Sequence, residues 1–355
     1  MASASAAVGG NAIAGPMLRM VRATPVSGAV ETISASKLLP SATATAGRKA
    51  NASAPPPAPA SHVAPLPPAE SGTFRVVTWN ILGQVYAKSQ WFTHSPRPCL
   101  KQARRWAQIH ELVRVMNPDV MLLQEVDNFG DVHEPAFRDL GFDALYLQRP
   151  NGKHDGCCVA YRREKFEIVD DDNAVLKVDL NEIALSKQSK DDVERFTRDN
   201  VALAVRLRVR AMPTKEAVFA TTHLFWDPAM ADVKLAQARS VADTVLKVHS
   251  NAPLIVFGAD LNSTLDSDVV AEFHQRSFVD SYAAVRDSST CENKFVTNVT
   301  PGFTEAIDHL YLRGHGARVE HVLELPHATH PDVSGGLPNW LWPSDHLPLA
   351  ADVRI

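Results

Sequence analysis

Apolar and polar residues follow two different periods along the chain from Phe74 onward. Short apolar runs, typical of buried strands, are separated by stretches in which apolar residues recur every three or four positions, which is typical of helices. Helices are predicted at 101–116 and 230–248. Strands are predicted at 74–78, 120–123, 201–209, 217–222, 254–257, 308–312 and 349–353. This alternation predicts an α/β fold.

Two of the predicted strands form a hairpin. From Val201 to Val209, apolar residues alternate with Ala and Arg, which is the period of a strand with one face in water. Residues 217–222 follow across a turn at 212–214 and pair with this strand. Because such a hairpin excludes a purely parallel sheet, we expect a four-layer sandwich of two packed mixed β-sheets flanked by helices.

The first 71 residues differ in composition from the rest. They are rich in Ala, Ser, Pro, Gly and Thr, and they have too few large apolar residues to offset the entropy of ordering them. We therefore predict a disordered tail at 1–71 and a folded domain at 72–355. Basic residues in the tail outnumber Glu31 and Glu70, a bias typical of an organellar transit peptide, although a plain flexible tail explains it equally well.

Composition excludes several classes of protein. The 36 basic and 40 acidic residues leave a net charge of -4, so any nucleic acid would bind in a local groove and not on a broadly basic surface. Cys99, Cys157, Cys158 and Cys291 have no zinc-binding spacing, which favours structural thiols in a reducing compartment. No apolar stretch is long enough to span a bilayer, so we expect a soluble protein without a membrane partner.

Polar side chains stand at the ends of the predicted strands at six places. They are Asn80, Glu125, His223, Asp260 with Asn262, Asp308, and Asp345 with His346. Taken singly, each has an ordinary explanation, because Asn and Asp form local turns and a histidine is usually a satisfied, partly buried side chain. Strand ends converge in an α/β fold, so we interpret the whole set as one functional site.

The oxygen ligands in this set suit a hard divalent cation. Mg²⁺ takes one or two carboxylates together with substrate phosphate and water, and Glu125 with Asp345 or Asn80 would provide them. Such an ion polarises a phosphoryl oxygen and offsets the charge that develops during in-line attack. The set therefore predicts a divalent-metal-dependent phosphoesterase.

The remaining groups suit the activation of water and the binding of phosphate. Asp260 is placed to orient and deprotonate water, and Asn262 of the same D-x-N turn to hold the phosphate. His346, kept protonated by a buried Asp308, would stabilise the pentacovalent state.

Several sequence runs resemble one known superfamily. They include Val-Thr-Trp-Asn-Ile-Leu at 77–82, Leu-Gln-Glu-Val-Asp at 123–127, Asp-Gly-Cys at 155–157, Arg-Asp-Asn-Val-Ala at 198–202 and Pro-Ser-Asp-His at 343–346. The segment from about Phe74 to Ile355 resembles the exonuclease/endonuclease/phosphatase superfamily. It is most similar to the deadenylase branch, which contains the carbon catabolite repressor deadenylases, the Angel proteins and nocturnin. The run His-Leu-Phe-Trp-Asp-Pro at 223–228 is closer to the catabolite repressor and Angel group than to nocturnin.

The resemblance implies roles for individual residues. It implies that Asn80, Glu125 and Asp345 bind Mg²⁺, with Mn²⁺ as a substitute. Catalytic roles fall on His223, Asp260, Asn262, Asp308 and His346, and His223 and Asn262 also contact substrate. Pro228 and Phe303 fall where the poly(A) enzymes of the family sandwich an adenine, whereas burial of Phe303 in the core is the alternative explanation. Ala259 replaces the usual Gly before Asp260, which matters only if that backbone needs a positive φ.

The resemblance also implies a function. The expected activity is a 3'-5' exoribonuclease that prefers poly(A), with the 3' poly(A) end of RNA as its partner. Alternatives are phosphodiesterase or phosphatase activity on 2',5'-oligoadenylate, RNA 2',3'-cyclic ends or a 2'-phosphorylated dinucleotide. A catalytically dead RNA-binding module fits less well, because the polar set is intact. The sequence has no leucine-rich repeat for docking on a deadenylase complex, and we expect a cytoplasmic location, with a mitochondrion or another organelle as the alternative.

Overall fold

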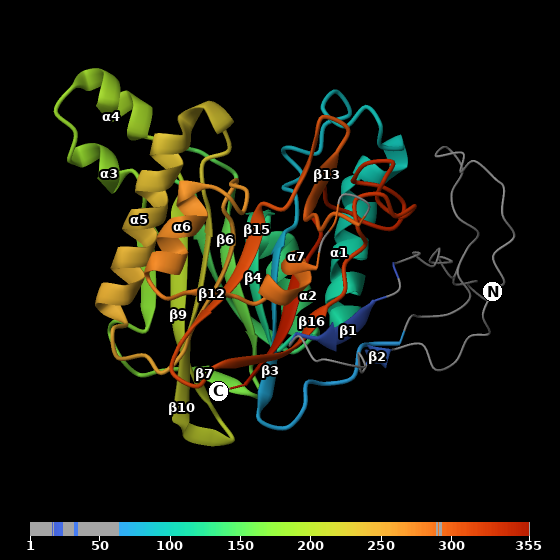
Figure 1. Ribbon diagram of the computed structural model, residues 1–355, viewed down its shortest axis with the longest axis horizontal. Coiled ribbons are helices and arrows are strands. Elements are labelled where there is room, and N and C mark those ends of the chain that lie inside the picture. The colour runs from blue at the N-terminus through green and yellow to red at the C-terminus, as the bar shows by residue number, and fades with distance from the viewer. Residues whose placement is uncertain are drawn as a thin grey trace, which may run out of the picture.

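The computed structural model describes residues 16, 18–23, 32–34, 64–288, 290 and 293–354. Within them lie two large mixed sheets (Figure 1). The first sheet has the strand order β2 (Thr32–Ser34), β1 (Arg19–Arg22), β16 (Arg318–Leu323), β17 (Leu349–Arg354), β3 (Thr73–Asn80), β4 (Val120–Asp127), β6 (Asp155–Arg162) and β5 (Phe142–Gln148). The second has the order β12 (Val279–Asp280), β15 (Asp308–Arg313), β11 (Ile255–Asp260), β10 (Met212–His223), β9 (Val201–Val209) and β7 (Phe166–Ile168), and β8 (Val175–Asp179) also pairs with β9.

Helices cover the outer faces of both sheets (Figure 1). Helix α1 (Gln102–Met116) packs Ile109 and Met116 on the first sheet, and α5 (Ala231–Val248) and α6 (Asp268–Gln275) pack on the second. Shorter elements are η1 (Arg97–Leu100), η2 (Phe129–His133), α2 (Glu134–Asp139), α3 (Glu182–Leu185), α4 (Lys190–Phe196), η3 (Pro228–Met230), α7 (Ala283–Asp287) and the hairpin of β13 (Asn298–Thr300) and β14 (Phe303–Glu305). The predicted sandwich of two mixed sheets between helices is confirmed.

The core has one layer between the sheets and one layer under each set of helices. Val76 and Leu122 of the first sheet join Leu203 and Phe219 of the second in the central layer. These strands are buried on both faces, because the partner sheet covers one side and helices cover the other. Burial of this apolar surface is the main force that holds the sheets face to face.

The hairpin of β9 and β10 differs in two details from the prediction. Ala202 and Ala204 are buried in the layer under α5, so the expected wet face of β9 is wrong for its first half. The chain turns at 210–211 and not at 212–214, and an irregularity in the pairing follows between Met212 and Glu216. Small Ala side chains allow the helix to approach, and an alternation of Ala with larger residues therefore does not mark a solvated face.

Part of the expected tail belongs to the folded domain. Strand β1 pairs antiparallel with β16, with Met20 opposite Leu323, and both Leu18 and Met20 are buried in the core. Leu66 is also buried, and its backbone N–H donates to the Val115 carbonyl at 2.7 Å. The prediction that 1–71 is wholly disordered is therefore wrong for these residues. Most of the tail lies outside the described residues, and the transit-peptide interpretation stays a prediction.

The remaining expectations about the chain as a whole concern membranes and thiols. None of the described helices is long and apolar enough to cross a membrane. Cys99, Cys157 and Cys158 are free, buried thiols, whereas Cys291 lies outside the described residues.

Strand direction explains why distant residues meet at one edge. β3 runs parallel to β4, and β10 runs parallel to β11, so the carboxyl ends of each pair lie together. β15 is antiparallel to β11 and begins opposite its end, which places Asp308 across from Asp260. β17 is antiparallel to β3, with Leu349 opposite Thr78, so the residues before Leu349 lie near the end of β3.

Candidate active site

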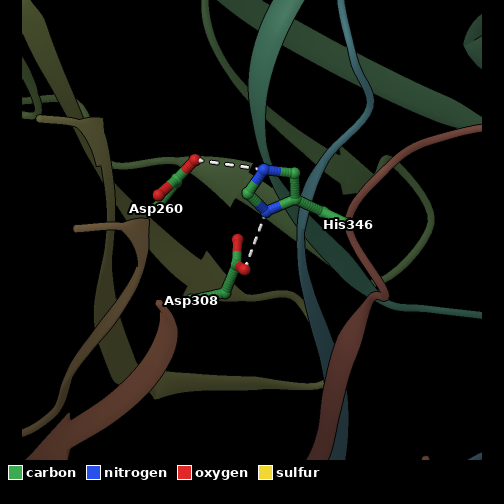
Figure 2. A group of neighbouring side chains, drawn as sticks. All are labelled: Asp260, Asp308 and His346. Carbon is green, nitrogen blue, oxygen red and sulfur yellow. Dashed lines mark hydrogen bonds and ion pairs between the residues drawn. The ribbon is translucent and has the colours of Figure 1, made fainter. Parts of the chain in front are cut away.

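A buried carboxylate–imidazole–carboxylate group lies at this edge (Figure 2). His346 Nδ1 lies 2.8 Å from Asp308 Oδ2, and His346 Nε2 lies 3.7 Å from Asp260 Oδ2. Burial alone would lower the pKa of His346, but the charges of Asp308, Asp260 and Asp345 outweigh it and hold that pKa well above 6.5. The imidazole is therefore protonated at neutral pH.

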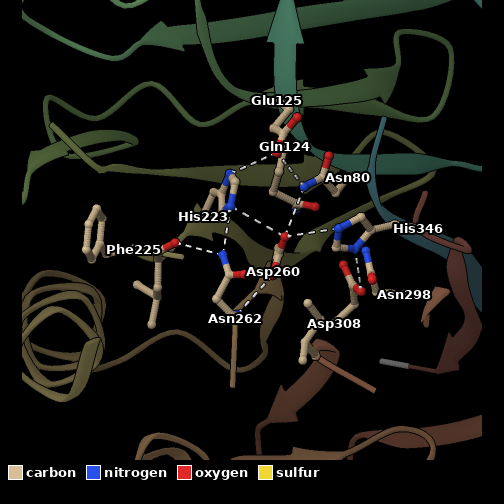
Figure 3. Close-up of polar contacts among 12 residues, drawn as sticks. Asn80, Gln124, Glu125, His223, Phe225, Asp260, Asn262, Asn298, Asp308 and His346 are labelled. Carbon is tan, nitrogen blue, oxygen red and sulfur yellow. Dashed lines mark hydrogen bonds and ion pairs between the residues drawn. The ribbon is translucent and has the colours of Figure 1, made fainter. Parts of the chain in front are cut away.

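The same network extends to Asn80, Glu125 and His223 (Figure 3). Asn80 Nδ2 donates to Glu125 Oε1 at 3.1 Å and to Asp260 Oδ2 at 2.9 Å. His223 bridges the same two acids, with Nε2 3.4 Å from Asp260 Oδ2 and Nδ1 3.9 Å from Glu125 Oε1. Residues from strands of both sheets thus form one connected site.

Glu125 reaches the site because β4 is irregular there. Its φ is +54°, and the pairing of β4 with β6 shifts between Leu123 and Val126. Gln124 consequently points between the sheets, where it donates to Thr221 Oγ1 at 2.8 Å, while Glu125 Oε2 accepts the Gly83 N–H at 3.0 Å. Burial, together with the charge of Asp345, raises the pKa of Glu125 against the lowering effect of His223. A cation beside this carboxylate would stabilise its charged form.

Asp260 and Asn262 form the predicted D-x-N turn. The Asn262 N–H donates to Asp260 Oδ1 at 2.9 Å, and Asn262 itself takes the positive φ of 48°. Ala259 has no positive φ, so the replacement of Gly at this position causes no strain. Burial would raise the pKa of Asp260, but His223, His346 and the amide donors hold it below its ordinary value. Asp260 therefore stays ionised.

The amide of Asn262 is already engaged. Its Nδ2 lies 2.9 Å from His223 Nε2 and donates to the Leu224 carbonyl at 3.0 Å, and Lys234 Nζ donates to the Asn262 carbonyl at 2.8 Å. Asn262 thus positions His223, and its contact with phosphate stays a prediction. His223 Nδ1 is buried and has no hydrogen-bond partner among the described residues.

Two groups of side chains can be compared as a metal site. Asp260, Asp308 and His346 have ligand atoms that all lie within 4.8 Å of one another. Because His346 Nδ1 already pairs with Asp308 Oδ2 at 2.8 Å, His346 fits this geometry better as a hydrogen-bond donor than as a ligand. Glu125 and Asp345 fit a cation better, because the nearness of Asp345 adds to the raised pKa of Glu125.

Asn80 is held by hydrogen bonds inside the site, and its metal role stays a prediction. Its Oδ1 accepts the Leu82 N–H at 3.0 Å, and its Nδ2 faces the carboxylates of Glu125 and Asp260. The amide nitrogen is a donor, whereas Oδ1 keeps a second lone pair that is available to a metal. Asn80 therefore orients the two acids.

Arg105 is a site residue that the sequence pattern did not reveal. It is 0% exposed, and it donates to the carbonyls of Pro343 at 2.7 Å, Ile81 at 2.7 Å and Leu82. Burial lowers the pKa of Arg105 to about 10, which leaves it charged. It thereby ties the chain after Asn80 to the loop that carries His346. Only its place on the core side of a helix signals this role.

Asn298 was also missed. Its Nδ2 lies 3.4 Å from Asp345 Oδ2, and its backbone forms a bridge with His346. It belongs to β13, so this hairpin is in contact with the site.

Pro228 and Phe303 lie outside the polar network. Pro228 is exposed at the start of η3, five residues after His223. Phe303 is 46% exposed on β14, five residues before Asp308. Burial of Phe303 in the core is therefore excluded, whereas its contact with adenine stays a prediction.

Comparison with known proteins now identifies the family. The model of the Endonuclease/Exonuclease/phosphatase family matches residues 77–346, from β3 to His346. The chain belongs to this family. Its members are hydrolases of the nuclease and phosphatase type that depend on divalent metal ions.

Relatives place the chain in the deadenylase branch. It is 30% identical over 325 residues to carbon catabolite repressor protein 4 homolog 4 of Arabidopsis thaliana, covering 79% of this chain and 78% of that protein. The CCR4-Not complex 3'-5'-exoribonuclease subunit Ccr4 of Saccharomyces cerevisiae is 27% identical over 79% of this chain, but the chain spans only 38% of its length.

Solved structures with the same fold include two of this branch. ANGEL2, a 2',3'-cyclic phosphatase, has a TM-score of 0.66 at 21% identity, covering 81% of this chain and 97% of that one. The human Nocturnin catalytic domain has a TM-score of 0.61 at 20% identity, covering 79% and 93%. These two likenesses concern the fold.

Proposed function

We propose that the protein is a magnesium-dependent 3'-5' exoribonuclease that prefers the poly(A) end of RNA. The observation that carries this proposal is the juxtaposition of an ionised carboxylate, Asp260, and a protonated imidazole, His346, at one buried position. Hydrolysis of a phosphodiester needs a group that orients water and a group that bears positive charge toward the phosphate. A relative named as a 3'-5'-exoribonuclease supports RNA as the substrate class.

Asp260 is the group that acts on water in this mechanism. Asn80 and the Asn262 N–H fix its carboxylate by hydrogen bonds of 2.9 Å each. Because its pKa is depressed, Asp260 remains an anion at neutral pH and holds water by accepting a hydrogen bond from it.

His346 is the group that acts on the phosphate. Asp308 Oδ2 accepts a hydrogen bond from His346 Nδ1–H at 2.8 Å, and the Nε2–H of His346 therefore points toward Asp260. A donor that is already oriented and charged stabilises the negative charge of the pentacovalent state without reorganisation.

Glu125 and Asp345 are the residues that would hold Mg²⁺. Both belong to the polar edge where the strand ends converge, and oxygen ligands are those that Mg²⁺ prefers. When bound, the ion polarises a phosphoryl oxygen and offsets developing charge. His223, whose Nδ1 faces Glu125 at 3.9 Å, adjoins this side of the site.

The preference for poly(A) rests on Pro228 and Phe303. If the exposed ring of Phe303 stacks on an adenine, Phe303→Ala should weaken the use of oligoadenylate by about 1–3 kcal/mol, the usual value for one base on an aromatic platform. Oligouridylate should be affected less. A folded variant with an unchanged preference for adenine would refute this role.

A substrate panel tests the proposed function. Purified protein with Mg²⁺ is incubated with oligoadenylate, mixed RNA, 2',5'-linked adenylate, RNA with a 2',3'-cyclic end and a 2'-phosphorylated dinucleotide. We expect nucleotides to be released stepwise from the 3' end of oligoadenylate, and the Asp260→Asn variant to release none. Release from only the cyclic or 2'-phosphorylated substrates would replace the proposed activity with a phosphatase.

A further inference from the structure

A pocket of about 240 Å³ adjoins the site and has no part in the chemistry above. Residues 264–266 and 305–306 form two of its walls, and Arg286, Lys294 and Phe295 complete the lining. Its volume is below the ~300–1,000 Å³ of pockets that bury drug-sized ligands, so it suits a fragment of one nucleotide.

Both walls continue directly from catalytic segments. Residue 264 follows Asn262 by two positions, and residue 306 precedes Asp308 by two. The chain advances at most ~3.6 Å per residue, so each wall begins within about 7 Å of a catalytic backbone position. The wall at 305–306 also continues from Phe303, and Glu305 pairs with Asn298, which contacts Asp345. The pocket therefore lies beside the reaction centre.

The charges of the pocket disfavour a phosphate as its occupant. Arg286 Nε lies 2.7 Å from Asp280 Oδ2, and Lys294 Nζ lies 2.6 Å from Glu305 Oε1. Both cations are therefore already neutralised by carboxylates, and Asp266 adds a further negative charge. A phosphate would have to compete with these carboxylates for each cation.

The same lining suits a flat, neutral ring with polar edges. Leu265 is 44% exposed, and the guanidinium of Arg286 lies over the ring of Phe295 at 4.6 Å, which makes that wall flat. Asp266 and Glu305 offer acceptors, and Nη1 of Arg286 is a buried donor with no partner among the described residues. Flat apolar faces with donors and acceptors at the rim are the features that bind nucleobases.

We infer that this pocket is a second base subsite, which holds the base of an RNA nucleotide adjoining the one at the reaction centre. The inference rests on the proposed function. The subsite couples to the chemistry through Arg286, whose Nη2 donates to the Asp308 carbonyl at 3.0 Å. It is separate from the surface of Phe303, which is not part of the lining.

Leu265 provides the test, because it is exposed and its replacement should not disturb folding. Leu265→Ser and Leu265→Glu are compared with Leu185→Ser, which changes an 83% exposed leucine on α3 that does not line the pocket. The value of kcat/KM is measured on oligoadenylates of two to six nucleotides and on a chromogenic phosphodiester of a single nucleotide. We expect both Leu265 variants to lose about tenfold on the oligoadenylates and nothing on the single-nucleotide ester, the effect of one lost base contact.

The other possible results count either against the base subsite or against the proposed function, and the two cases can be told apart. Equal losses on the ester and the oligoadenylates, or none on either, would overturn the subsite. So would a Leu185→Ser variant that loses as much as the Leu265 variants. If inorganic phosphate inhibited the Leu265 variants more weakly than the wild type, the pocket would be a phosphate site and not a base subsite. A wild-type protein that cleaves the ester but no RNA of any length would instead overturn the proposed function.

Discussion

Asp308→Asn tests the charged state of His346 without changing the shape of the site. Asp308 Oδ2 lies 2.8 Å from His346 Nδ1, and both side chains are buried. Removal of one partner of a buried ion pair costs about 3–5 kcal/mol. The pKa of His346 should therefore fall in the variant, although Asp260 at 3.7 Å restores part of the effect.

The sign of the effect on stability follows from the raised pKa of His346. Such a group stabilises the fold fully below its unfolded pKa of about 6.5, and this stabilisation is lost as the pH rises through the folded pKa. The variant should therefore melt lower than the wild type by roughly 6–20 °C near pH 6, taking about 2–4 °C per kcal/mol. The difference should shrink toward high pH, where His346 is neutral in both proteins.

Thermal unfolding in excess chelator from pH 5.5 to 9 is the appropriate assay, because no metal then competes for the carboxylates. A purely structural role for Asp308 predicts the same loss of melting temperature at every pH. A pH-independent loss, or none, would refute a protonated His346. The rate of RNA hydrolysis provides a second measurement, because the alkaline limit of activity should move to lower pH in the variant.

Three further predictions concern the metal, the loop clamp and the N-terminal strand. Glu125→Ala should abolish the binding of Mn²⁺ measured by calorimetry and also hydrolysis at any Mg²⁺ concentration, whereas His346→Ala should keep the metal; the reverse would place the ion on His346. Arg105→Met leaves buried carbonyls without a donor and should lose about 1–3 kcal/mol in denaturant unfolding, and Arg105→Lys should lose less because Lys keeps a donor; equal stabilities of the two variants would exclude the role of Arg105 in joining these loops. Met20→Asp should lower the melting temperature and leave kcat unchanged, because it buries a charge next to β16. An unchanged melting temperature would show that β1 does not pack on β16.

The site was largely predictable because its residues stand at strand ends. Parallel pairing brings Asn80 and Glu125 together, as it does His223 and Asp260, and no side-chain detail is needed for that. The partnership of Asp308 with His346 follows from the antiparallel entry of β15. These are consequences of backbone direction, which hydrophobic patterns encode.

Features that depend on side-chain orientation were not predictable in the same way. The amide of Asn80 can turn either its oxygen or its nitrogen toward the two acids. Its orientation is set by the hydrogen bond from the Leu82 N–H to Oδ1, which no sequence pattern reveals. Arg105 occupies a helix face that also carries Ile109 and Leu112. Its guanidinium is tolerated there because backbone carbonyls accept its hydrogen bonds.

The N-terminal strand was missed because composition averages over too long a window. Residues 1–71 have few large apolar residues overall, yet Leu18 and Met20 alternate with Arg19 and suit a strand with one buried face. A segment this short cannot form a stable strand alone, and the edge of β16 provides the backbone hydrogen-bond partners and the hydrophobic layer that stabilise it.

Charge balance explains why the metal should lie on one side of the site. Asp260 and Asp308 are both within 3.7 Å of a nitrogen of His346, so a protonated imidazole already offsets this half. Glu125 receives its hydrogen bonds from the amide of Asn80 and the Gly83 N–H, which are neutral, and burial raises its pKa. Arg105 is a buried cation that feels the charges of Asp345 and Glu125, but its hydrogen bonds go to backbone carbonyls and to the Gln84 side chain. A divalent ion beside Glu125 would therefore gain the most from the uncompensated charge there, and it would leave His346 free to donate its proton to the phosphate.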